Sequence, residues 1–152
     1  KQSLQKQITS SGLTSVTLKG WSDDLKSIFA DADLFCSPSL DEPFGLVIGE
    51  AMAMGLPVIA SDTDGASELF GINTGSADAA LQYGGMIIPA GDTGALAAAI
   101  GRFCADEKLR QTTGRNARKR IETSFTHTHM ADQLDQLIRS VTPSPRAERS
   151  YI

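Results

Sequence analysis

The sequence predicts a Rossmann-like α/β fold, a three-layer α/β/α arrangement in which a mainly parallel sheet lies between two layers of helices. Short apolar or β-branched runs alternate with longer stretches of helical periodicity, which is the pattern of parallel strands joined by crossover helices. The runs are continuously apolar, as in strands that are buried on both faces. The composition agrees, because 152 residues with 41% hydrophobic and 21% charged side chains are typical of one globular domain.

The first half of the chain supplies the strands, which are expected at residues 15–18, 33–37, 56–61 and 85–89. Ser22 is expected to cap the helix that follows the first strand, with Asp23 and Asp24 in its first turn. Residues 46–54 are predicted to form a helix because Gly55 and Pro57 follow them. A further helix is expected to start near residues 67–68.

Beyond residue 90 the sequence predicts three helices. Apolar residues between 96 and 104 recur at helical spacing and indicate one buried face. Residues 107–123 form a charged amphipathic pattern that Thr112, Thr113 and Gly114 would weaken. Residues 130–141 repeat the pattern of a helix with one buried face. Residues 142–152 contain two prolines and no periodicity, so we expect a domain over residues 1–141 and then a tail or linker.

Charge and cysteine content exclude several classes of protein. The 14 Lys and Arg residues against 18 Asp and Glu residues leave a net charge of −4, which argues against a nucleic-acid partner. Two cysteines are too few for a disulfide framework and favour a reducing, cytoplasmic compartment. The apolar stretch 43–60 is interrupted by glycines, prolines and a glutamate, so it does not read as a membrane span.

Two glutamates beside one predicted helix start carry the chemistry. Glu50 is the one ionisable residue in the range 45–61, on a helix apolar nearly all round, so we expect it to be buried with a partner or a ligand. Glu42 lies in the loop before this helix, at the carboxyl end of a predicted strand. A helix start binds phosphates, Gly45 permits close approach, and a carboxylate one turn later accepts bonds from a ribose diol. The combination favours a nucleotide sugar as ligand.

Other interpretations of these residues remain open at this point. Glu50 could pair with an arginine in the core, or the two carboxylates could be the acid and base of a glycoside hydrolase. The D-x-D sequence at residues 62–64 follows a predicted strand and precedes Gly65, so it favours a polar turn over a metal site. His127 and His129 are two residues apart, so on a helix they would not share a metal ion. The basic residues between 108 and 120 favour a solvated helix face over contact with anionic lipid headgroups.

Residues 42–61, EPFGLVIGEAMAMGLPVIAS, resemble the E-x7-E signature of the retaining group 1 glycosyltransferases of GT-B fold. The segments VTLKG at 16–20, ADLFCSPS at 32–39 and GGMIIPAGD at 84–92 resemble neighbouring segments of that family at the same spacing. The likeness extends from about residue 2 to residue 141 and implies the C-terminal, donor-nucleotide-binding domain of such an enzyme.

The resemblance implies a role for each matching residue. Glu42 would be catalytic and contact the hydroxyls of the transferred sugar, and Glu50 would bind the ribose. The remaining donor-binding residues would be the loop beside the base and the backbone amides that hold the sugar and distal phosphate: Gly20, Trp21, Phe44, Gly45 and Leu46. The reaction would be hexosyl transfer from a UDP or GDP sugar with retention of anomeric configuration, without a metal or another cofactor.

The resemblance also implies partners and missing parts. A glycan, lipid or small-molecule acceptor would be bound mainly by an N-terminal domain, as in glycan or lipopolysaccharide biosynthesis, in the cytoplasm or at the inner membrane surface. The family's first two donor-domain strands are absent from this sequence, so we expect an exposed or re-paired sheet edge at residues 15–18 and negligible activity of the chain alone. Residues 70–83 are longer than in the family and are read as a surface insertion. A non-catalytic sugar-nucleotide-binding module, or an epimerase or phosphorylase of GT-B fold, is the alternative.

Overall fold

The computed structural model describes residues 2–71 and 77–141 and contains a three-stranded parallel sheet. Its strands β1 (Phe35–Ser37), β2 (Val58–Ser61) and β3 (Gly85–Ile88) lie in the order β1-β2-β3. Cys36 pairs with Ile59, which in turn pairs with Met86. The ends of the three predicted strands shift by one or two residues, and the predicted parallel pairing is confirmed.

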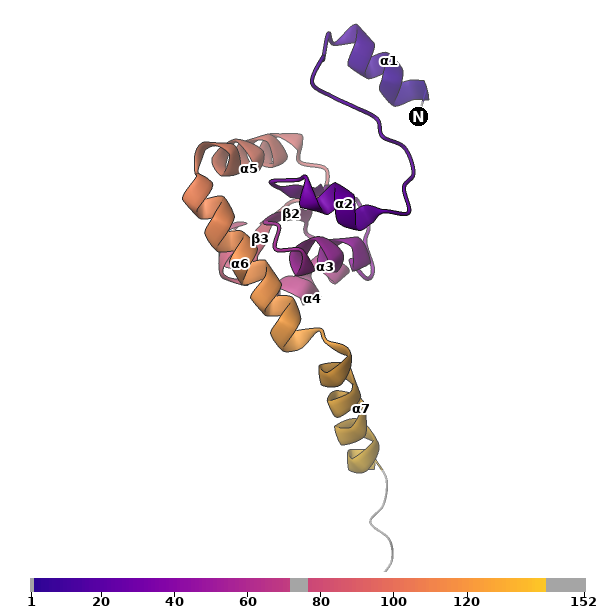
Figure 1. Ribbon diagram of the computed structural model, residues 1–152, viewed down its shortest axis with the longest axis vertical. Helices are drawn as coiled ribbons and strands as arrows, with labels where there is room; N and C mark the ends of the chain where they lie inside the picture. Colours follow the sequence, from indigo (N-terminus) through magenta and orange to yellow (C-terminus); the bar gives the residue numbers. More distant parts are fainter. Residues whose placement is uncertain (1, 72–76, 142–152) are drawn as a thin grey trace, which may run out of the picture.

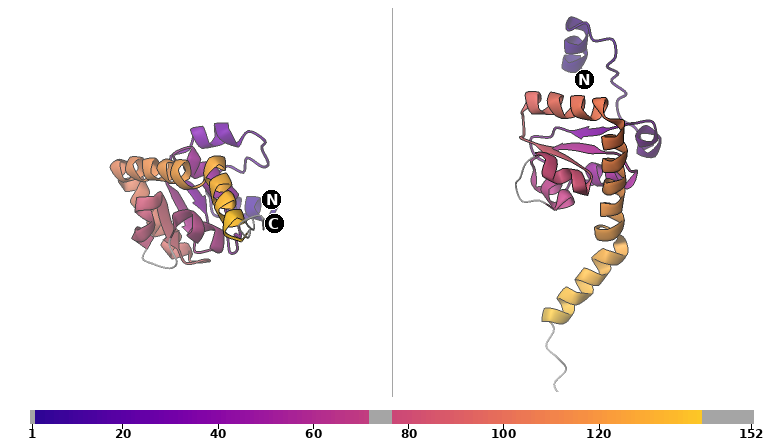
Figure 2. Two further views of the ribbon diagram at one scale, coloured as in Figure 1. Left: turned by 90° about the horizontal axis from the view of Figure 1, so that it is seen from below. Right: turned by 90° about the vertical axis from the view of Figure 1, so that its left-hand side faces the viewer.

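Helices cover both faces of this sheet, which confirms the three-layer arrangement (Figure 2). Helices α3 (Leu46–Ala53) and α4 (Asp64–Phe70) lie on one face, and α5 (Thr93–Ala105) lies on the other. The central strand β2 serves both layers because its side chains alternate: Val58 and Ala60 join the core beneath α3 and α4, and Ile59 joins the core beneath α5. Helix α4 starts at Asp64, three residues earlier than predicted, because Asp64 and Gly65 are helical rather than part of a turn.

Helix α6 (Glu107–Ser124) runs without a break along one side of the layers and packs on α3 and on the 3-10 helix η1 (Ala77–Tyr83) (Figure 1). Thr112, Thr113 and Gly114, which were predicted to weaken this helix, do not interrupt it. Thr113 and Gly114 are buried, since this part of α6 crosses the turn that follows α3 at close range. Packing therefore outweighs the low helix propensity of these residues.

The two ends of the described chain stand away from the layers (Figure 1). Helix α1 (Gln2–Ser10) was not expected from the sequence. Helix α7 (His127–Val141) was, yet none of its residues is buried, so the predicted burial of its apolar face is wrong. In the part of the chain that the structure describes, no helix combines the length and the apolar character needed to cross a bilayer.

The segment before β1 differs most from the prediction. Residues 15–18 are not a strand: they have no pairing partner in the described sheet, and Val16 is exposed. A strand is stable only when a neighbour takes up its backbone hydrogen bonds, so propensity alone did not suffice. Helix α2 (Leu25–Ala30) follows and is capped by Asp24 rather than Ser22, whose hydroxyl accepts from the Asp24 amide instead. Of the predicted insertion, residues 72–76 lie outside the described residues, as does the predicted tail, 142–152.

Candidate functional site

The start of α3 lies at the carboxyl edge of the sheet, where β1 leads through a loop into this helix. Gly45 caps the helix in the left-handed region, with φ +66°, and is buried. The first bond within the helix runs from the Gly49 amide to the Gly45 carbonyl at 2.9 Å, so the preceding amides have no acceptor inside the helix. The side chains of Phe44 and Leu46 are 78% and 76% exposed. Two predicted donor-binding residues therefore frame an open helix start.

Glu42 lies directly at this helix start. Its carboxylate Oε1 accepts a hydrogen bond from the Gly45 amide at 3.1 Å, and the side chain is half-buried. A carboxylate there is stabilised by the positive end of the helix dipole. The structure thus brings together Glu42 and Gly45, which were predicted to share the sugar end of a donor.

Glu50 corrects one part of the sequence analysis, because its side chain is exposed rather than buried. Helix α3 buries only one stripe, formed by Ile48, Ala51 and Met52, and Glu50 lies off that stripe. Within residues 2–71 and 77–141, no side-chain hydrogen bond or ion pair engages its carboxylate, so the alternative of a core pairing with an arginine is not found there. This carboxylate is available to a ligand.

Glu50 faces two hollows, one on each side of α3. The first has a volume of about 460 Å³ and lies between α3 and α2. Its lining includes Asp23, Asp24 and Lys26 beside Glu50. Hydrogen bonds from the Ser27 side chain and backbone lower the pKa of Asp24 below its usual value.

The predicted loop residues Gly20 and Trp21 are not in the lining of this hollow, and the Trp21 side chain is 88% exposed. The following residues of the same loop, Asp23 and Asp24, line this hollow together with Glu50. The sequence predicts them only as residues of the first turn of a helix. Their acidic side chains, two and three residues after Trp21, were the signal that could have identified them.

The second hollow, of about 510 Å³, lies where α3, α4 and the junction of α6 and α7 meet. Phe44, Gly45, Leu46 and Glu50 contribute to it from the candidate donor residues. The other side is lined by residues that the sequence analysis did not connect with the site: Gly65, Glu68, Leu69, Ile121, Phe125 and His127. They are distant in sequence and become neighbours only through the packing of α4 and α6.

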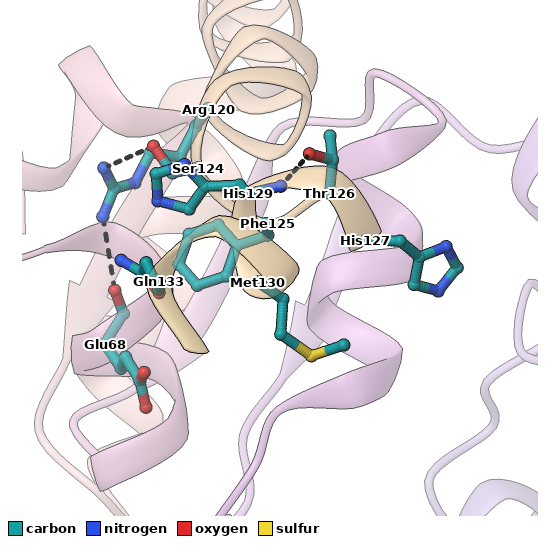
Figure 3. A pocket seen from close by; sticks show the side chains of 9 residues that line it. All are labelled: Glu68, Arg120, Ser124, Phe125, Thr126, His127, His129, Met130 and Gln133. Carbon is teal, nitrogen blue, oxygen red and sulfur yellow. Dashed lines mark hydrogen bonds between the residues drawn. The ribbon is translucent and has the colours of Figure 1, made fainter. Parts of the chain in front are cut away.

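A third hollow, of about 520 Å³, lies beyond the second at the start of α7 (Figure 3). His127 and His129 point in opposite directions there, in agreement with the expectation that they do not share a metal ion. Arg120 forms one wall and is not part of a solvated face: its Nε donates to the Leu69 carbonyl at 2.9 Å and its Nη1 to Ser124 Oγ at 3.3 Å. Its guanidinium also stacks over the Phe125 ring, 5.2 Å from the ring centroid.

The D-x-D sequence after β2 is used for local structure. Asp62 Oδ1 accepts a hydrogen bond from the Ser67 hydroxyl at 3.1 Å, and Asp64 is the first residue of α4. The amide of Gly65 donates to the Glu42 carbonyl at 2.9 Å, which ties the start of α4 to the loop before α3.

The chain resembles known proteins along most of its length. The family model described as glycosyl transferases group 1 matches residues 1–120. The putative glycosyltransferase YtcC of Bacillus subtilis is 34% identical over 121 residues, which are 78% of this chain and 28% of YtcC. The lipopolysaccharide core biosynthesis glycosyltransferase LpsE of Rhizobium meliloti is 29% identical over 143 residues, 92% of this chain and 39% of LpsE. This chain therefore spans about a third of the length of these curated relatives.

Solved structures give the same result for the fold. Sucrose-phosphate synthase of Thermosynechococcus elongatus superposes with a TM-score of 0.76 at 34% identity, over 91% of this chain and 33% of that one. The Anabaena protein HepE in complex with UDP superposes with a TM-score of 0.78 at 30% identity, over 92% of this chain and 36% of that one. HepE has also been solved with UDP-glucose, with a TM-score of 0.76.

Proposed function

The chain belongs to the group 1 glycosyltransferases, and on that premise we propose that it forms the donor side of a retaining hexosyltransferase that uses a nucleoside diphosphate sugar. The observation that carries the proposal is the pair of carboxylates on either side of the α3 start. Glu42 is bonded to the Gly45 amide, and Glu50 lies one turn further along with its carboxylate unpaired in the described chain. The relatives in complex with UDP and UDP-glucose support a uridine nucleotide, with a guanosine nucleotide as the alternative.

The chemistry follows from charge and geometry. Glu50 accepts hydrogen bonds from the two ribose hydroxyls, and the free amides at the α3 start receive the diphosphate. As the bond between sugar and diphosphate breaks, negative charge grows on the diphosphate, and the helix dipole and amides stabilise it. Glu42 orients the transferred sugar through its hydroxyls. The acceptor is bound mainly by parts of the enzyme outside this chain, so the 152-residue chain alone has negligible activity in this proposal.

Calorimetric titration of the complete natural protein with UDP, GDP and ADP sugars tests this proposal. We expect tight binding of one of them, and Glu50→Gln should weaken it by a factor of roughly 10 to 150, the equivalent of ~1.5–3 kcal/mol for a hydrogen bond to a charged group. Glu107→Gln is the matched control, because Glu107 is also exposed on a helix but lies near the amino ends of the strands. Unchanged binding by Glu50→Gln would refute the ribose role.

Turnover separates an enzyme from a binding module. We expect transfer of the sugar to an acceptor with the anomeric configuration of the donor, read from the coupling constant of the product's anomeric proton. Inversion of that configuration would refute the retaining mechanism. Tight binding without transfer to any acceptor would favour the non-catalytic module.

A further inference from the structure

The loop that carries Glu42 is hydrogen-bonded to the first turn of α4. The Gly65 amide donates to the Glu42 carbonyl at 2.9 Å, while the Glu42 carboxylate accepts from the Gly45 amide at 3.1 Å. Glu42 is therefore fixed at two points, one on its backbone and one on its side chain. One point belongs to α3 and the other to α4, which follows the next strand along the chain.

Only glycine fits at residue 65. A Cβ atom built on Gly65 would lie 2.6 Å from the Phe44 carbonyl carbon, 2.7 Å from the Glu42 carbonyl oxygen and 2.7 Å from the Gly45 amide nitrogen. All three are backbone atoms of the loop, which cannot rotate away as a side chain can. Any larger residue must therefore move the backbone from Glu42 to Gly45, which carries Glu42 and two of the three amides proposed to hold the sugar and distal phosphate. Glu50 lies about one turn into α3, outside this backbone segment.

We propose that Gly65 is a positioning residue for the transfer reaction: its missing side chain and its amide set the place of Glu42 and of the amides at the α3 start. This inference rests on the proposed function. Gly65 acts through Glu42 and touches no reacting atom itself. Since misplacement of a reacting group by about 1 Å can cost about 100-fold in rate, the contact matters for catalysis and not only for packing.

Steady-state kinetics and calorimetry on the complete natural protein test the proposal with the variant Gly65→Ala. We expect kcat to fall about 100-fold, while the Kd of the nucleoside monophosphate, which lacks the distal phosphate and whose ribose Glu50 binds in the proposed function, changes less than about threefold. The affinity gained by adding the sugar to the diphosphate should be lost. The matched control is Gly101→Ala, because a Cβ on Gly101 in α5 would meet no atom within 4 Å and should leave both quantities unchanged.

A double-mutant cycle shows whether Gly65 acts through Glu42. In a Glu42→Gln background, Gly65→Ala should lower kcat by about tenfold or less rather than about 100-fold, because one of the groups that it positions is already lost. An equal loss of kcat in both backgrounds, or an equal loss of affinity for the nucleoside monophosphate and for the diphosphate sugar, would refute the positioning role. A natural protein that binds no nucleoside diphosphate sugar would instead refute the proposed function, and this inference with it.

If Gly65→Ala does not fold, amide hydrogen exchange of the unmodified protein tests the hydrogen bond between Gly65 and Glu42 on which the proposal depends. The Gly65 amide is expected to exchange at least about 100-fold more slowly than in an unstructured peptide, because it is buried and donates to the Glu42 carbonyl. Exchange of this amide at the rate of an unstructured peptide would overturn the proposal.

Discussion

Gly114 and Gly101 are both interior helical glycines, and we predict that replacing them with alanine changes stability in opposite directions. A Cβ on Gly114 in α6 would lie 2.2 Å from the Gly55 carbonyl oxygen, whereas a Cβ on Gly101 in α5 would meet nothing within 4 Å. Alanine adds helix propensity at both sites, about 1 kcal/mol in each case. At Gly114 the added Cβ would overlap backbone atoms, which cannot rotate away, so we take the upper end of the usual destabilisation by overpacking, about 3 kcal/mol.

The expected result is a loss of about 2 kcal/mol in the free energy of unfolding for Gly114→Ala and a gain of about 0.5–1 kcal/mol for Gly101→Ala. Urea unfolding of the 152-residue chain, followed by far-ultraviolet circular dichroism, measures both. The slope of the free energy against urea should stay the same, because neither variant alters the area exposed on unfolding. If Gly114→Ala is as stable as Gly101→Ala, the close approach of α6 to the turn after α3 is refuted.

Three further predictions follow from the packing. Arg120→Met should cost about 2 kcal/mol of stability, because Arg120 donates to the Glu68 and Leu69 carbonyls and stacks on Phe125, while Lys119→Met on the exposed side should cost less than about 0.5 kcal/mol by thermal unfolding. Burial raises the pKa of the Cys36 thiol, so at pH 8 a smaller fraction of Cys36 is in the reactive thiolate form. Alkylation of Cys36 should therefore be at least about tenfold slower than alkylation of the exposed Cys104, and equal rates in the folded chain would contradict this. Truncation after Thr126 should change the free energy of unfolding by less than about 1 kcal/mol, because no residue of α7 is buried, and a larger loss in urea titration would show that α7 packs on the layers.

Most of the fold could be predicted because its signals are local. The continuous apolar runs at β1, β2 and β3 and the helices between them have the right type and order, and the parallel sheet follows from their alternation. The prediction for residues 15–18 failed because a strand needs a neighbour, and no local pattern reports whether one is present. The prediction that one face of α7 is buried failed for a similar reason, because an apolar stripe shows only that a helix is able to pack.

The candidate site could be predicted in part. Glu42, Gly45 and Glu50 were found because they are close in sequence, on one helix and the loop before it. Asp23 and Asp24, beside Glu50 in the same hollow, were assigned to a helix turn only. Gly65 was read as a turn residue, because its contact with the Glu42 loop spans more than twenty residues of chain and a whole strand.

By itself, the sequence determined the α/β class, the family and the pair of glutamates at the start of one helix, because each depends on residue types at short spacing. The tertiary structure decided that Glu50 is exposed and available rather than buried, because the packing of α3 on the sheet determines which face of the helix is buried. It also decided that Gly65 lies against the Glu42 loop and that Arg120 donates a hydrogen bond to the Leu69 carbonyl at the C-terminal end of α4. These contacts join segments far apart in the chain, and only the packing of helices on a common sheet brings such segments together.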